Sequence, residues 1–249
     1  PFANIAHGCN SLMATKTALQ FGDYVVTEAG FATDLGAEKF FNIKCRKAGL
    51  QPAMSVLVAT SQALKLSGGA NEKTMMLPDR ETLTKGLRNL EKHIAILKSF
   101  KQRVLVSLNR YHFDTDEEIA YLRSWCAEKE VAFAVNESFR LGGEGALEMA
   151  QAVVDICETP PVPLQHTYDA EDDIETKIRK IVTTIYGGKD VVLYKKAQET
   201  LKKIKALGLE HLPVCMAKTQ YSFTHNPAIS GLDGDFKIDV DDLVISKGA

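Results

Sequence analysis

The sequence predicts an α/β fold with a mostly parallel sheet flanked by helices, together with a smaller helix-plus-strand region. Three observations indicate it. Residues 55–59 form a continuous apolar run of strand length, typical of a parallel strand covered on both faces. Residues 103–145 have the pattern of a complete β-α-β unit, whereas residues 169–207 carry mainly helical patterns. We therefore expect an α/β core over residues 1–160 and the smaller region over 161–249.

The first fifty residues alternate loop, helix and strand signals. Glycine and small polar residues at 8–11 predict a loop that leads into a short helix. Residues 24–27 predict a short buried strand. A loop with two glycines follows at 28–36, where glycine permits conformations closed to other residues. A helix from about 37 to 48 is expected next.

A long helix is expected after Pro78 and Asp79. Its apolar residues recur at steps of three and four and define one buried face: Leu83, Leu87, Leu90, Ile94 and Leu97. Gly86 lies inside this pattern and costs about 1 kcal/mol relative to alanine.

The β-α-β unit is the most informative stretch. Its strands are expected at 103–108 and 131–135, and a helix is expected at 116–129. Thr115 and Glu118 fit a capping box, in which each side chain satisfies a free backbone N–H at the helix start.

The remainder alternates helices with connectors. A helix is expected to run from Gly145 to Cys157 and to end at the proline-rich connector 159–163. Acidic residues from Asp169 and basic residues before Gly187 favour a second helix. A third is expected at 194–207, with its lysines on a solvated face. Strands are predicted at 212–217 and 236–240.

Composition excludes several classes of partner. The 249 residues carry a formal net charge of −2, so neither a nucleic acid nor an anionic membrane surface is expected as a partner. No run reaches the roughly 18 apolar residues of a membrane span. Five scattered cysteines without a C-x-x-C pair favour reduced thiols and a cytoplasmic location. The six histidines show no metal-ligand spacing, and no metal site is predicted.

Polar and aromatic residues follow the predicted strands. Ligands of open α/β sheets bind beyond the carboxyl ends of parallel strands. The candidate site therefore gathers residues from four strand ends: Glu28, Asp34, Lys39, Thr60, Asn109, Asn136 and Glu137. Tyr111 and Phe139 come just after two of these ends, where a flat ring could lie between them, and His112 could reach the same ligand. Each residue taken singly also fits a satisfied loop amide or a capped carboxylate.

A glycine-rich loop precedes the helix that ends at Cys157. Gly142, Gly143, Glu144 and Gly145 could hold an anion or a carbonyl with backbone N–H groups, or could simply form a flexible turn. A nucleotide-binding P-loop is absent from the sequence. Residues 14–17 resemble only its tail, without the preceding glycine.

Four ordered stretches carry a further pattern: 1–11 (PFANIAHGCNS), 27–40 (TEAGFATDLGAEKF), 142–145 (GGEG) and 213–221 (PVCMAKTQY). In these stretches the chain resembles the formate–tetrahydrofolate ligase family, also called formyltetrahydrofolate synthetase. The resemblance implies an ATP-dependent enzyme that activates formate as formyl phosphate, which N10 of tetrahydrofolate then attacks to give 10-formyltetrahydrofolate. It also implies Mg-ATP, a homo-oligomer, and a pterin ring held between Tyr111 and Phe139.

The chain departs from that family at several positions. Phe139 stands where tryptophan is common, and Ala32-Thr33 replaces Gly-Ala. Within residues 58–69 the family pattern has a branched apolar residue, an arginine and a histidine or asparagine; the chain has Ser61, Gln62 and Ser67 there. The family's P-loop lies upstream of Pro1, so we expect this chain to be the middle of a longer protein and to be inactive alone.

Two other functions remain open. One is a non-catalytic family member that binds folate or a partner. The other is a different phosphate-handling α/β enzyme, in which the glycine-rich loop binds an anion and both aromatic residues belong to the core.

Overall fold

The computed structural model describes residues 8–246 and contains two compact units. Residues 52–164 form one, called here the sheet unit. Residues 8–51 and 165–246 form the other, called here the terminal unit. This division differs from the predicted boundary near residue 160, because residues 8–51 pack with the C-terminal part of the chain; for example, Asn42 bonds Thr167. Whether 1–160 and 161–249 are domains stays a prediction. Each unit is described by itself.

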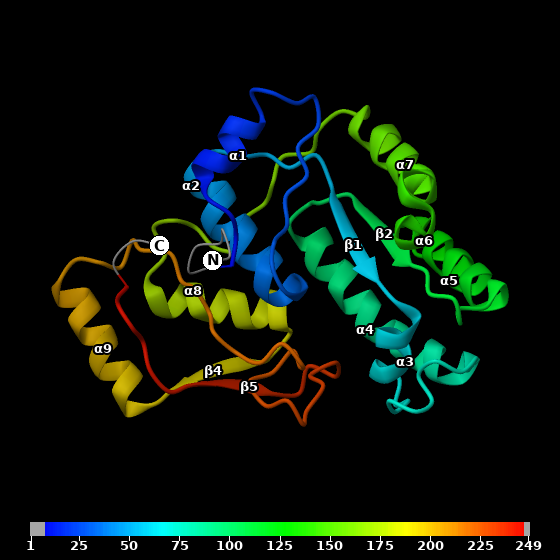
Figure 1. Cartoon of the computed structure of the whole chain (residues 1–249). Coiled ribbons are helices and arrows are strands. Elements are labelled where there is room, and N and C mark those ends of the chain that lie inside the picture. The colour runs from blue at the N-terminus through cyan, green and yellow to red at the C-terminus, as the bar shows by residue number, and fades with distance from the viewer. Residues whose placement is uncertain (1–7, 247–249) are drawn as a thin grey trace. The chain divides into compact units, whose positions relative to one another are not determined.

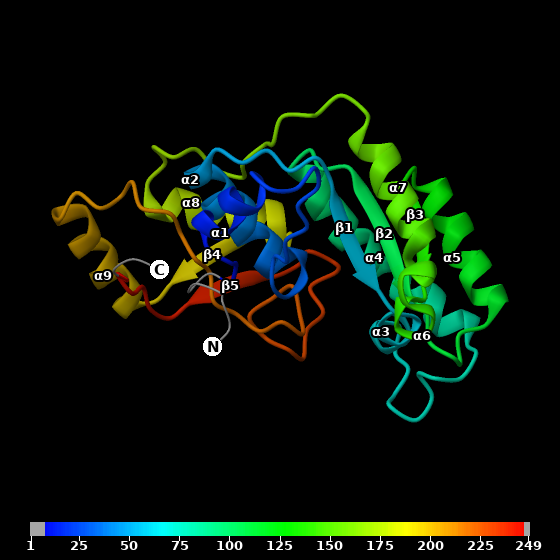
Figure 2. The same ribbon diagram turned by 45° about the horizontal axis from the view of Figure 1, so that its top comes forward.

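The sheet unit contains the predicted parallel sheet. Its strands are β1 (Ser55–Ala59), β2 (Val104–Asn109) and β3 (Ala132–Asn136), paired in that order and all parallel. Figure 2 shows them side by side. Central strand β2 is buried along Val104–Leu108. These pairings confirm the α/β fold and the β-α-β unit.

Helices connect and cover these strands. They are α3 (Ser61–Ser67), α4 (Arg80–Ser99), α5 (Asp116–Glu128), α6 (Ser138–Leu141), the 3-10 helix η3 (Gly142–Ala146) and α7 (Leu147–Cys157). Figure 1 shows α4 beside β1 and β2. The predicted helices at 116–129 and after Gly145 are confirmed.

The prediction that strand 55–59 is covered on both faces is wrong within this unit. Val56 and Val58 are 40% and 59% exposed. β1 is an edge strand, and α7 packs mainly on β2 and β3. One face of β1 is therefore open.

The capping box of α5 is half confirmed. Thr115 Oγ1 accepts a hydrogen bond from Glu118 N at 3.2 Å, as predicted. The Glu118 carboxylate turns instead to Lys65 Nζ, at 2.8 Å, and to the backbone N–H of Asp79, at 2.9 Å. Glu118 therefore joins three segments.

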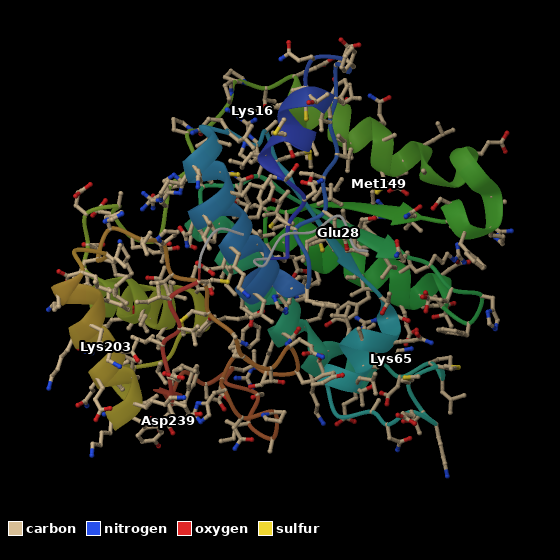
Figure 3. All side chains as sticks on the ribbon, turned by 60° about the vertical axis from the view of Figure 1, so that its left-hand side comes forward. Lys16, Glu28, Lys65, Met149, Lys203 and Asp239 are labelled. Atoms are coloured by element: carbon tan, nitrogen blue, oxygen red, sulfur yellow. The ribbon has the colours of Figure 1, made fainter. Side chains whose placement is uncertain are left out.

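The terminal unit is mainly helical. It contains α1 (Leu12–Ala18), the π-helical turns η1 (Ala32–Ala37) and η2 (Phe40–Cys45), α2 (Arg46–Ala48), α8 (Ile174–Lys180), η4 (Ile181–Tyr186) and α9 (Lys195–Ala206). Strands β4 (Asp190–Leu193) and β5 (Lys237–Val240) form a parallel pair, side by side in Figure 1. The exposed lysines of α9, among them Lys203, confirm its solvated face (Figure 3).

Two predicted strands of this unit are wrong, and one strand was missed. Residues 24–27 have no strand partner, and Val26 is 91% exposed. Residues 212–217 are also irregular, although Val214 and Met216 are buried. The strand that pairs with β5 is β4, whose four residues between Gly188 and the next helix gave too short a pattern to recognise. Residues 1–7 and 247–249, including most of the first family-like stretch, lie outside the described residues.

Candidate functional site

Three polar residues occupy one row at the carboxyl edge of the sheet. Ala59 pairs with Leu108, and Leu108 with Val135, so Thr60, Asn109 and Asn136 come next on their chains. Asn136 Nδ2 donates to Asn109 Oδ1 at 3.0 Å, and Asn136 Oδ1 accepts from Ser138 N at 3.0 Å. Thr60 caps α3 through Ala63 N. The structure thus brings these three predicted residues together at the sheet edge, and each side chain already makes a hydrogen bond within the protein.

Tyr111 follows β2 on a tightly bonded turn. Tyr111 is 43% exposed. Its backbone N–H donates to Asp114 Oδ2 at 2.8 Å, and its carbonyl accepts from Asp114 N at 3.1 Å. Phe113 stacks on the Tyr111 ring, with centroids 5.4 Å apart and planes inclined by 6°. His112 is exposed and makes an edge contact with Phe113.

Phe139 lies on the short helix after β3. It is fully exposed, and no described neighbour covers its ring. Glu137, one residue past the strand, is half-buried and pairs with Arg140 at 2.9 Å and with Arg110 at 3.9 Å. The ion pairs occupy the Glu137 carboxylate, whereas the Phe139 ring is available for a ligand.

The glycine-rich loop closes back on the end of β3. Glu137 N donates to Gly145 O at 2.9 Å. A Cβ on Gly145 would lie 2.5 Å from the Glu137 carbonyl group, so only glycine fits there. Gly142 has φ +60°, whereas a Cβ on Gly143 would meet nothing within 4 Å. Gly143 and the exposed Glu144 therefore border open space, while Gly145 fixes the loop to the sheet.

The three weaker catalytic candidates lie in the terminal unit. Glu28 is exposed and Lys39 is half-buried. Asp34 is buried and forms an ion pair with Lys218 at 2.6 Å, with side chains only 4% and 3% exposed. Burial lowers the pKa of Lys218, and the Asp34 carboxylate opposes that shift.

Glu38 is a buried acid that the sequence reasoning missed. It is fully buried, and burial raises the pKa of its carboxyl to about 7 against the lowering effects of Asn42 and Lys39. Asn42 Nδ2 donates to Oε1 at 2.8 Å, whereas Oε2 has no hydrogen-bond partner among the described residues. Glu38 and Lys218 both stand in the quoted family-like stretches, which was the available signal.

The described residues were expected to hold neither a P-loop nor a metal site, and two observations bear on these sites. Residues 14–17 lie inside α1, and Thr15 Oγ1 accepts from Lys44 Nζ at 2.8 Å. No group of three or more His, Cys, Asp or Glu side chains within 8–246 could hold a metal ion. Over the same residues, no helix is long and apolar enough to cross a membrane.

Comparison with known proteins agrees with the motifs. The family model described as formate–tetrahydrofolate ligase matches residues 1–249. The chain is 54% identical over 250 residues to the formate–tetrahydrofolate ligase of Parabacteroides distasonis and 52% identical to that of Bacteroides thetaiotaomicron. It is 50% identical to the Campylobacter concisus protein of the same name. In each case the match covers 100% of this chain and 45% of the relative, so the chain spans less than half the length of these relatives.

Proposed function

The chain belongs to the formate–tetrahydrofolate ligase family, and on that premise we propose that it supplies the pterin-binding part of a longer ligase. That protein forms 10-formyltetrahydrofolate from formate, ATP and tetrahydrofolate. ATP phosphorylates formate to formyl phosphate and leaves as ADP. N10 of tetrahydrofolate then attacks the formyl carbon and loses a proton, and phosphate leaves as the new C–N bond forms.

The exposed rings of Tyr111 and Phe139 carry this proposal. Both rings follow strands of one parallel sheet at the edge where ligands of such sheets bind. An aromatic side chain left in water is a ready stacking surface for a flat heterocycle. Asn109, Asn136 and the glycine-rich loop beside them offer amide and backbone groups for the polar edge of a pterin.

The phosphate chemistry is not assigned to residues of this chain. The sequence has no P-loop, and the described residues contain no group of three or more His, Cys, Asp or Glu side chains that could hold a metal ion. We therefore expect the residues that bind ATP and Mg²⁺ to belong to the rest of the longer protein.

The test is tetrahydrofolate binding and turnover by the full-length protein that contains this chain. Tyr111→Ala and Phe139→Ala should each weaken tetrahydrofolate binding by roughly 1–3 kcal/mol in calorimetry, by analogy with base stacking. The Michaelis constant for formate should not change. Tyr194→Ala is the matched control, because Tyr194 is 48% exposed and lies at the start of α9. Unchanged affinity in both folded variants would remove these rings from the site.

A folded full-length protein that binds tetrahydrofolate but makes no 10-formyltetrahydrofolate would favour a non-catalytic family member. Gln62 and Ser67, which replace a cation and an imidazole or amide of the family pattern, motivate that alternative. Anion binding without folate binding would instead favour a different phosphate-handling enzyme.

We also propose that the longer protein is cytoplasmic and forms a homo-oligomer. No disulfide joins the five cysteines, all of which lie within the described residues, and three of them are buried, which fits a reducing cytoplasm. A homo-oligomer is proposed from the family resemblance. Light scattering of the full-length protein after size-exclusion chromatography measures its mass and tests that assembly.

A further inference from the structure

We propose that Asp114 and Ser61 are positioning residues for Tyr111: together they fix the turn that presents its ring to the folate. This inference rests on the proposed function, because it takes Tyr111 to be a folate-stacking residue. It concerns two residues that make no stacking contact themselves.

The Asp114 carboxylate lies beneath the turn. It is 6% exposed, and its two oxygens have different partners. Oδ2 accepts the backbone N–H of Tyr111 at 2.8 Å, and Oδ1 accepts the hydroxyl of Ser61. Since Asp114 N also donates to the Tyr111 carbonyl at 3.1 Å, both backbone polar groups of Tyr111 are held by this one residue.

Ser61 connects the turn to a different strand end. It is 1% exposed and is the first residue of α3, directly after Thr60, which follows β1. The contact between Ser61 and Asp114 therefore links the carboxyl ends of β1 and β2. A buried charge-assisted hydrogen bond has a narrow preferred geometry, so the link restricts where the turn can lie.

The Tyr111 ring is restrained on one side as well. Phe113 stacks on it at a centroid distance of 5.4 Å. Phe113 thus packs on one face of the ring, while Tyr111 as a whole stays 43% exposed. A ring held in its binding position before the ligand arrives loses less conformational freedom on binding.

The Ser61 hydroxyl joins the two strand ends, because it donates to the Asp114 carboxylate. A side chain without a hydroxyl cannot make this contact, so removing the Ser61 hydroxyl tests it specifically.

The experiment uses the full-length protein that contains this chain. Tetrahydrofolate affinity is measured by calorimetry, and Michaelis constants are measured separately for tetrahydrofolate, formate and ATP. Ser61→Ala and Asp114→Ala should weaken tetrahydrofolate binding, Asp114→Ala by roughly tenfold. The Michaelis constant for tetrahydrofolate should rise in parallel, while those for formate and ATP stay unchanged.

Asp114→Asn provides the conservative variant. Its amide oxygen can still accept the Tyr111 N–H, and the Ser61 hydroxyl can turn to accept from the amide nitrogen. Asp114→Asn should therefore restore most of the affinity lost in Asp114→Ala. When Asp114→Asn is combined with Ser61→Ala, the tetrahydrofolate affinity should not be restored. Ser55→Ala is the matched control, because its hydroxyl bonds Gln102 at 3.2 Å at the opposite end of β1.

A second cycle separates positioning from folding. In a Tyr111→Ala background the backbone bonds to Asp114 remain, but no ring is left to position. Asp114→Ala should then cause no further loss of tetrahydrofolate affinity, although it still lowers stability. Two results would overturn the inference. One is that Asp114→Ala weakens tetrahydrofolate binding as much in the Tyr111→Ala background as in the unchanged protein. The other is that folded Ser61→Ala and folded Asp114→Asn/Ser61→Ala both keep full tetrahydrofolate affinity. If Tyr111→Ala itself leaves affinity unchanged, the proposed role of Tyr111 fails instead.

Discussion

Lys65 on α3 and Glu118 on α5 form a buried ion pair, in which Lys65 Nζ lies 2.8 Å from the Glu118 carboxylate and the side chains are 0% and 6% exposed (Figure 3 labels Lys65). Lys65 Nζ also donates to the Leu77 carbonyl at 2.9 Å. Glu118 accepts from the backbone N–H of Asp79, the N-cap residue of α4. The pair therefore joins α3, α4 and α5 beneath the sheet edge that carries the candidate site.

Removing the Glu118 carboxylate should strongly destabilise the sheet unit. Glu118→Ala leaves the Lys65 ammonium buried without its counter-charge, which costs roughly 3–5 kcal/mol. Trp125 is the single tryptophan of the chain and lies on α5, so its fluorescence during urea unfolding reports on this unit. Glu81→Ala is the control, because its pair with Lys85 is exposed and should contribute less than about 1 kcal/mol. An equal loss of unfolding free energy in the two variants would show that the buried pair stabilises the unit no more than the exposed pair does.

Gly86→Ala should destabilise the same unit, although helix propensity alone predicts a gain. A Cβ on Gly86 would lie 1.8 Å from the Leu64 carbonyl oxygen, so α3 and α4 would have to separate. The expected loss is roughly 1–3 kcal/mol or more, measured by Trp125 fluorescence in urea. A gain of about 1 kcal/mol, as for a glycine in an exposed helix, would contradict the observed packing.

Gly86 illustrates how far the sequence could predict the fold. The helix that contains it, the parallel β-α-β unit and the start of α5 followed from periodicity and capping, which are local. The need for glycine at position 86 could not be predicted locally, because it comes from the backbone of Leu64, 22 residues earlier in the chain. Residues 24–27 failed for the same reason: a strand needs a neighbour, and an apolar run does not reveal whether one exists.

The candidate site shows a similar limit. Sequence predicted Asn109, Tyr111 and Asn136 at one sheet edge; the register pairs Asn109 with Asn136, and Tyr111 lies two residues beyond the end of β2. It could not show that Asp114 bonds Ser61, since the two residues are 53 positions apart. The buried Glu38 was also missed, because nothing in its local pattern distinguishes a buried glutamate from an exposed one on a helix.

Glu38 should make the terminal unit less stable as the pH rises. Its folded pKa of about 7 exceeds the ordinary value of 4.5, so the folded state keeps a proton that the unfolded state releases between these values. Stability is then highest below about pH 4.5 for this group, falls between pH 4.5 and 7, and is constant above.

Glu38→Gln should remove that dependence. Above pH 7 the variant should be more stable by up to about 3 kcal/mol, and below pH 4.5 the two proteins should differ little. Urea unfolding followed by far-ultraviolet circular dichroism at a series of pH values measures the difference between them. A difference that does not change with pH would mean that the pKa of Glu38 is the same in the folded and unfolded states.

Gly143→Ala and Gly145→Ala should separate ligand contact from loop structure. Gly145→Ala places a Cβ 2.5 Å from the Glu137 carbonyl group, so the loop must leave the end of β3 and stability should fall by roughly 1–3 kcal/mol. Gly143→Ala meets nothing within 4 Å and should leave stability unchanged. If tetrahydrofolate lies against this loop, Gly143→Ala should still weaken its binding in calorimetry, because the added methyl occupies the space that the ligand needs. Full affinity in Gly143→Ala together with a loss in Gly145→Ala would assign the loop a purely structural role, and would place the pterin elsewhere along the Tyr111 and Phe139 edge.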